Sequence, residues 1–273
     1  MLARRLLPAL LLTAALAACS SDDKLTQVEK PVGTLYNDAF TEMHDENYRR
    51  AAALFDEVER QHPYSQWATR AQLMAAFAHY QNLKYDDAIV ALDRFIQLHP
   101  GYENVDYAYY LKAICYYEQI TDIRRDQKMT ELALDSLNEV TRRFPGTPYA
   151  IDAARKLQLA RDHLAAKSME IGRYYQEKKI WNAAINRFRD VIDRYQTTTH
   201  TPEALERVVE CYLALGLREE AVKAASVLGY NYPDSEWYRD AYSLVNNGRT
   251  APDSDSGNSR GWFGRAWNSL SPF

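Results

Sequence analysis

The chain has 273 residues, with 33 Lys and Arg against 37 Asp and Glu, so its formal net charge is only −4. This near balance provides no basic field of the kind that nucleic acid attracts, and we expect no nucleic-acid partner. The sequence contains no glycine-rich phosphate loop, no G-x-S-x-G and no H-E-x-x-H pattern, and its six histidines lack the spacing of metal ligands. We therefore expect a protein that is not an enzyme and that uses no cofactor and no metal.

Residues 1–18 have the features of a secretory signal peptide. Arg4 and Arg5 give a basic start, and residues 6–16 form an apolar run that is too short to span a bilayer. No second apolar run reaches the 18 residues or so of a membrane span, so we expect no other membrane-crossing segment.

The four residues L-A-A-C that end at Cys19 resemble the bacterial lipobox, in which the cysteine is lipidated and becomes the mature N-terminus. Ser20 is similar to the residue found in lipoproteins that are sorted to the outer membrane. An ordinary signal peptide with an incidental cysteine is the alternative. The lipobox predicts an outer-membrane lipoprotein anchored at Cys19, with the polar stretch 19–31 as a lipidated tether.

A sequence pattern typical of a helix then occurs five times. Each occurrence begins at a small residue and ends at a terminator twelve residues later. The small residues are Ala51, Ala88, Ala133, Ala184 and Ala221, and the terminators are Pro63, Pro100, Pro145, Gln196 and Pro233. The small residues stand 37 to 51 residues apart, a period typical of a tetratricopeptide (TPR) solenoid built from helix pairs. Such a pair cannot bury its apolar face alone, so successive pairs must stack.

We predict an all-α, TPR-type right-handed solenoid of about five helix pairs plus a capping helix. An unrepetitive helical bundle is the alternative. The predicted pairs are 33–46 and 48–61, 65–82 and 85–98, 103–119 and 128–143, 148–177 and 180–195, and 202–215 and 218–230, followed by a cap at 235–247. After three of the breakers, a hydroxyl at Ser65, Thr147 or Ser235 suits a helix N-cap.

Two departures from the period predict additional structure. About eight extra residues near 120–127 enlarge the turn of the third pair, which we interpret as a loop held out for contact. The helix at 148–177 gains about four turns, so it would be about 45 Å long and would join the first three pairs to the last two.

These features divide the chain into five parts. Residues 1–18 are the signal peptide and 19–31 the tether; residues 32–146 hold pairs 1–3 and residues 147–247 hold pairs 4–5 with the cap. Residues 248–273 are rich in Gly, Ser, Asp, Pro and Asn and are expected to be a disordered tail. A short aromatic segment in that tail could bind a partner or the membrane, or be a poorly ordered end.

Cys115 and Cys211 lie on apolar helical stretches of the third and fifth pairs. Pairs that far apart in a stack cannot bring two Cα atoms within the roughly 7 Å that a disulfide needs. We therefore expect two free, buried thiols.

The twenty tyrosines suggest a peptide groove. In a solenoid of this kind the first helix of each pair lines the concave face, and helical register directs a set of aromatic residues toward it. The set is Tyr36, Phe40, Phe77, Tyr80, Tyr107, Tyr110 and Tyr117. Aromatic anchors with hydroxyl groups suit an extended peptide. For any single residue of the set, packing between neighbouring helices is the alternative.

Several segments together resemble one family. They are the lipobox cysteine, the stretch D-R-F-I-Q-L-H-P at 93–100, D-Y at 106–107, R-F-P at 143–145, Y-Y at 174–175 and N-R-F at 186–188. In combination they resemble the BamD family, also called ComL, the lipoproteins of the outer-membrane β-barrel assembly (BAM) machine. The resemblance extends from Cys19 to about residue 246.

The resemblance implies a periplasmic scaffold for the folding and insertion of outer-membrane proteins. Its N-terminal pairs would receive targeting segments of unfolded β-barrel proteins, and its C-terminal pairs would bind the barrel-forming subunit BamA, beside other BAM lipoproteins. Arg187 matches the family arginine on the BamA side. His62 stands where the family often has a tyrosine implicated in recognition of the targeting segment. A TPR lipoprotein scaffold for pilus or cell-wall assembly is the alternative, and an enzyme accessory is a more distant one.

Overall fold

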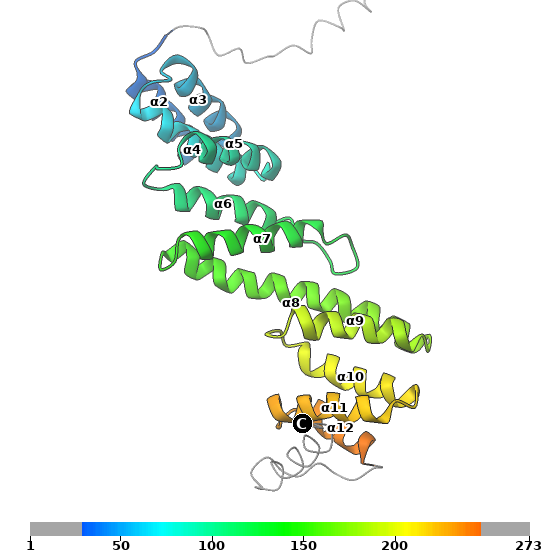
Figure 1. Cartoon of the computed structure of the whole chain (residues 1–273). Helices are drawn as coiled ribbons and strands as arrows, with labels where there is room; N and C mark the ends of the chain where they lie inside the picture. Colours follow the sequence, from blue (N-terminus) through cyan, green and yellow to red (C-terminus); the bar gives the residue numbers. More distant parts are fainter. Residues whose placement is uncertain (1–28, 247–273) are drawn as a thin grey trace, which may run out of the picture.

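The computed structural model describes residues 29–246, which form a long stack of eleven α-helices and contain no strand. The first and last helices lie at opposite ends of the stack (Figure 1). The helices are α2 (Val32–His44), α3 (Tyr48–Gln61), α4 (Gln66–Gln81), α5 (Tyr85–Leu98), α6 (Val105–Tyr117), α7 (Lys128–Arg143), α8 (Pro148–Glu177), α9 (Trp181–Arg194), α10 (Thr201–Ala214), α11 (Arg218–Asn231) and α12 (Glu236–Val245). The all-α, TPR-type solenoid of five pairs with a capping helix is confirmed.

Local sequence accounts for the helix ends between pairs. The side chains of Ser65, Thr147 and Ser235 accept hydrogen bonds from the backbone N–H three residues later, as predicted for N-caps. The helix predicted at 65–82 therefore begins one residue later, because Ser65 is its cap. In the third pair the first helix begins at Val105, whose N–H donates to the carbonyl of Tyr102 within the preceding turn.

Within four of the five pairs, a single residue of positive φ reverses the chain between the two helices. These residues are Glu46, Leu83, Lys179 and Gly216, with φ values of 61°, 57°, 59° and 75°. A left-handed residue just after a helix satisfies its last carbonyls and ends it. The third pair lacks this turn and uses the longer loop 118–127 instead.

The core is a row of five hydrophobic clusters, each formed by one pair together with the first helix of the next. The first helix of each following pair contributes one face to the cluster behind it and another face to the cluster ahead. All five repeated alanines, from Ala51 to Ala221, are completely buried in these clusters or beside them. The apolar pattern therefore specifies stacking as well as helix formation.

The loop 118–127 is partly anchored to α8 and remains largely exposed. The Nε of Arg124 pairs with Oε1 of Glu170 on α8 at 2.9 Å, and Nε2 of His163 donates to the carbonyl of Thr121 at 2.8 Å. A role of this loop in contacting a partner stays a prediction.

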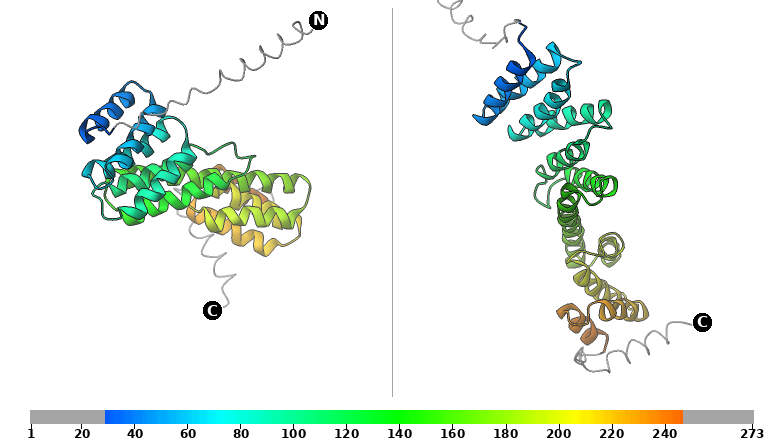
Figure 2. Two further views of the ribbon diagram at one scale, coloured as in Figure 1. Left: turned by 90° about the horizontal axis from the view of Figure 1, so that it is seen from above. Right: turned by 90° about the vertical axis from the view of Figure 1, so that its left-hand side faces the viewer.

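The 30-residue helix α8 has the predicted bounds, and at 1.5 Å per residue it is about 45 Å long. It packs on α7 with its first half and on α9 with its second half, and so joins the two parts of the stack (Figure 2). Cys115 and Cys211 are both free and buried, as expected. Burial raises the pKa of each thiol to about 12.

Candidate functional site

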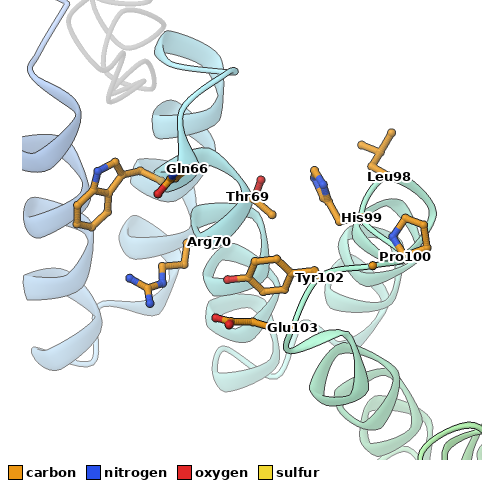
Figure 3. Close-up of a pocket in the computed structure, with 10 residues that line it drawn as sticks. Gln66, Thr69, Arg70, Leu98, His99, Pro100, Tyr102 and Glu103 are labelled. Atoms are coloured by element: carbon orange, nitrogen blue, oxygen red, sulfur yellow. The ribbon is translucent and has the colours of Figure 1, made fainter.

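An open cleft of about 650 Å³ lies between the first half of α4 and the segment that connects α5 to α6 (Figure 3). Its lining residues are Gln66, Trp67, Thr69, Arg70, Leu98, His99, Pro100, Gly101, Tyr102 and Glu103. The cleft is thus assembled from two segments: one follows the first terminator, Pro63, and the other contains the second terminator, Pro100.

The far wall of the cleft is fixed by contacts within the turn after α5. His99 Nε2 donates to Gln72 Oε1 on α4 at 2.8 Å. The ring of Tyr102 meets Phe95, a completely buried residue of α5, edge to face at 5.5 Å. These contacts hold the turn against α4 and keep Tyr102 at the cleft.

The near wall combines an aromatic ring with a cation. Trp67 is 39% exposed and its ring lies 4.8 Å from that of Tyr36 on α2. Arg70 is exposed and has no ion pair among the residues that the structure describes; in Figure 3 its guanidinium points away from Tyr102 and Glu103, whose side chains point toward α4 from the other wall. Burial raises the pKa of Tyr36, and the positive charge of Arg70 partly opposes that rise. The cleft therefore offers aromatic surface beside an accessible guanidinium.

The seven aromatic residues predicted to form a groove occupy different environments. Phe40 is 54% exposed on α2. Tyr36 is the member that adjoins the cleft, through Trp67. Phe77 and Tyr80 stack on one another at 6.3 Å beside the core cluster of α4, α5 and α6.

The remaining three members of the set lie where α6 meets α8. Tyr107 and Tyr110 both contact the ring of Tyr149, and the hydroxyl of Tyr110 donates to Asp152 Oδ2 at 2.6 Å. Lys156 Nζ lies 5.0 Å from the ring centre of Tyr117. Burial is the main cause of the raised pKa of Tyr107 and Tyr110. Packing therefore engages these tyrosines, and a peptide-binding role for the set stays a prediction.

Sequence reasoning missed Arg70, His99 and Tyr102 as members of a site. Trp67 was likewise missed as a member of the site, and its ring contacts that of Tyr36 on α2. The available signal was the position of these residues near two successive terminating prolines, Pro63 and Pro100, where stacked repeats bring their turns together.

Arg187 lies on α9 between buried neighbours, Ile185 and Phe188, but is itself exposed. It forms no ion pair with any residue in the range 29–246. It is therefore available to a partner. Cys19 lies outside the described residues.

A partly buried charge network, which the sequence did not suggest, occupies the C-terminal pairs. Arg173 on α8 binds Glu203 on α10 through two hydrogen bonds of 2.8 and 2.6 Å. Arg207 Nη1 donates to Glu210 Oε2 at 2.8 Å. Glu206 is only 3% exposed, and burial followed by the charge of Glu210 raises its pKa to about 8. This network links α8 to α10 through an arginine–carboxylate pair. Within residues 29–246, no group of three or more His, Cys, Asp or Glu residues has the arrangement of a metal site.

None of the helices in the described part of the chain combines the length and the apolar character that crossing a membrane requires.

Comparison with known proteins places this architecture in a family. The family model for YfiO, described as an outer membrane lipoprotein, matches residues 28–228. The outer membrane protein assembly factor BamD of Caulobacter vibrioides is 49% identical over 247 residues, which cover 89% of this chain and 81% of that protein. The factor of the same name from Rickettsia prowazekii is 47% identical over 244 residues, covering 89% of this chain and 97% of that protein.

Among solved structures, a thermophilic TPR protein of Thermus thermophilus covers 80% of this chain and 100% of its own, at 17% identity and a TM-score of 0.37. That similarity is too low to bear on function. The family model and the two relatives each extend over most of the helical stack. The chain therefore belongs to the YfiO, or BamD, family of outer membrane lipoproteins.

Proposed function

We propose that this protein is a non-enzymatic scaffold for outer-membrane protein assembly, anchored by lipid on Cys19 to the periplasmic face of the outer membrane. The observation that carries the proposal is the 47–49% identity, over 89% of the chain, to proteins named as outer membrane protein assembly factors. The lipobox supports the anchor, because the thiol of Cys19 is the group that would accept the lipid. More than one acyl chain, at about 0.8 kcal/mol per buried CH₂, would make the attachment stable.

In this proposal the N-terminal pairs receive the targeting segments of unfolded β-barrel proteins. The cleft supports this role because Trp67 and Tyr102 present aromatic surface, which suits the aromatic side chains of an extended peptide. The guanidinium of Arg70, which has no ion pair in the described residues, can donate charge-assisted hydrogen bonds to a carboxylate at the peptide's end. The cleft is open and shallow, so binding would be weak and transient, as handing a substrate onward requires.

The C-terminal pairs bind the barrel-forming subunit, a BamA-like protein, in the same proposal, and other BAM lipoproteins attach to the same assembly. Arg187 supports this because it is exposed, carries no intramolecular ion pair in the described chain and is held on a well-packed helix. A planar guanidinium binds a carboxylate in a two-pronged geometry that lysine cannot reproduce.

Affinity purification from detergent extracts of the native organism tests the proposal. We expect the full-length protein to recover a BamA-like subunit. Recovery of pilus or cell-wall components without any BamA-like protein would favour the alternative scaffold and contradict this one. A Cys19→Ala chain, expressed at the same level, is the matched control for the anchor. It should become soluble or stay unprocessed, and in either case leave the outer-membrane fraction in cells from which the BamA-like subunit is depleted.

A further inference from the structure

Tyr64, in the turn between α3 and α4, is the most exposed large hydrophobic side chain among the described residues, with a relative exposure of 101%. It has no hydrogen bond, ion pair or ring contact with any residue between 29 and 246. We call residues 62–65 the Tyr64 turn. An aromatic ring that packs on nothing within residues 29–246 contributes nothing to the fold of that part of the chain.

The repeat itself shows that the fold does not need an aromatic residue at this position. The residue after the terminating proline is Tyr64 in the first turn, but Gly101, Gly146 and Asp234 in the equivalent turns. All four turns connect a second helix to the first helix of the next pair. At this position only the turn nearest the N-terminal tether carries a large amphipathic side chain, so the explanation lies in something peculiar to that end of the stack.

What distinguishes that end of the stack is its contact with the end of the tether that begins at Cys19. The backbone N–H of Lys30 donates to Gln61 Oε1 at 2.9 Å, and Nε2 of His62 donates to the carbonyl of Lys30 at 2.7 Å. The tether is therefore fastened to the Tyr64 turn itself. Eleven residues separate Lys30 from Cys19, so even a fully extended chain would place the turn within about 40 Å of the lipid anchor.

From this geometry we propose that the Tyr64 turn rests on the phospholipid headgroups of the membrane that holds the lipid on Cys19, an inference that depends on the anchor in the proposed function. Tyrosine favours the membrane–water interface because its ring is apolar and its hydroxyl is polar. The acyl chains provide the affinity, and Tyr64 determines which face of the protein meets the bilayer. Anchoring raises the effective concentration of the turn at the surface, so one weak contact is enough to orient the stack.

The charges around the turn favour contact through the tyrosine over contact through an electrostatic patch. Lys30 pairs with Asp38 at 2.9 Å, and Arg60 pairs with Glu57. These two cations beside the turn are thus neutralised by carboxylates, and the contact through Tyr64 does not require anionic lipid. Since the cleft begins at Gln66 and Trp67, two and three residues after Tyr64, this orientation places the cleft beside the bilayer surface.

Spin labelling of the lipidated, full-length protein tests the proposal. A nitroxide is attached to Gln66→Cys, which leaves Tyr64 in place, and the matched control is Glu236→Cys, an exposed residue at the equivalent position after the last turn. Both proteins are bound to vesicles of phosphatidylethanolamine and phosphatidylglycerol, and collisions with a water-soluble nickel chelate are measured. The same labels on the Cys19→Ser chain in buffer give the reference, and the chain without an added cysteine corrects for Cys115 and Cys211.

We expect the label at position 66 to lose accessibility severalfold on vesicles, at low and high salt alike, and the label at position 236 to remain unchanged. Unchanged accessibility at both positions in protein that floats with the vesicles would overturn the contact while leaving the anchor intact. Protein that does not float overturns both the anchor and the contact. Protection that grows with the ratio of protein to lipid would identify a second copy as the occupant and would also overturn the proposal.

Discussion

Gly172 on α8 and Phe188 on α9 are in such close contact that no side chain fits between them. A Cβ built on Gly172 would lie 2.5 Å from Cε1 of Phe188 and less than 3.0 Å from two more atoms of the ring. Phe188 is completely buried in the cluster formed by α8, α9 and α10, so its ring cannot move aside freely. This crossing connects the long helix to the C-terminal pairs.

Gly172→Ala should therefore destabilise the protein. Overpacking a filled core costs about 1–3 kcal/mol, which outweighs the gain of up to about 1 kcal/mol that alanine has over glycine inside a helix. Chemical denaturation of the full chain measures the difference. Gly33→Ala is the matched control, because Gly33 on α2 has nothing within 4 Å of an added Cβ, and we expect that variant to be unchanged or slightly stabilised. Equal stability of the two variants would show that α8 and α9 can separate at no cost.

Glu206 should make the stability of the C-terminal pairs depend on pH. Burial and the charge of Glu210 raise its folded pKa to about 8, well above the value of 4.5 expected in the unfolded chain. The folded state thus binds this proton more tightly. The stabilisation that protonated Glu206 provides is fully present below pH 4.5 and is lost as the pH rises through about 8.

Glu206→Gln, which cannot ionise, should remove this loss. We expect the free energy of unfolding of the wild-type chain to fall between pH 5.5 and pH 8.5 relative to that of the variant. The variant should be the more stable of the two at the upper end. Taking the difference between the two chains at each pH cancels the other titrating groups. Parallel pH profiles would mean that Glu206 has an ordinary pKa in the folded protein.

Arg70 should contribute to peptide binding in the cleft when the peptide has a free C-terminal carboxylate. We expect Arg70→Gln to weaken binding of such a peptide by about two- to tenfold, the equivalent of roughly 0.5–1.5 kcal/mol for one hydrogen-bonded contact. The same peptide with an amidated end should bind both chains equally. Isothermal titration gives the affinities, and an equal loss for both peptides would exclude the carboxylate contact.

The predicted aromatic groove can now be tested at Phe40 separately from Phe77 and Tyr110. Phe40→Ala removes a ring that is 54% exposed, so any loss of peptide affinity should come with little change in melting temperature. Tyr110→Ala also removes the hydrogen bond to Asp152 and the contact with Tyr149, and should lower the melting temperature. If Phe40→Ala leaves affinity unchanged and the variants at Phe77 and Tyr110 lose affinity only in proportion to stability, the set serves packing alone.

Arg187 should matter to the proposed BamA-like partner and not to folding. Truncating one member of a buried interfacial charge pair costs about 2–5 kcal/mol, while a pair at an exposed rim is worth little. Arg187→Glu should therefore reduce co-purification of the partner and leave thermal unfolding unchanged. Arg189→Glu is the matched control, since Arg189 is also exposed on α9 and has no ion pair within the described residues. Equal losses from both substitutions would indicate a general charge effect, and normal binding by Arg187→Glu would remove this site.

The sequence by itself determined the helices, their order and most of their ends. The reason is that these features are local: apolar residues at three- and four-residue steps fix a helical face, proline ends it, and a hydroxyl such as that of Ser65 or Thr147 caps the next helix. The repeated alanines also indicated stacking, because a pair with one apolar face must cover it.

Only the tertiary structure decided which side chains meet across the stack. Trp67 and Tyr102 are 35 residues apart in sequence and line one cleft because two successive turns lie side by side. Glu206 has the sequence context of a surface residue, but packing around α10 leaves it 3% exposed. The loop 118–127 is likewise partly anchored by Glu170 and His163 of α8. Helical periodicity specifies which face of each helix is buried, but the angles at which packed helices cross determine which polar groups are brought together. Those angles are set by contacts such as the one between Gly172 and Phe188.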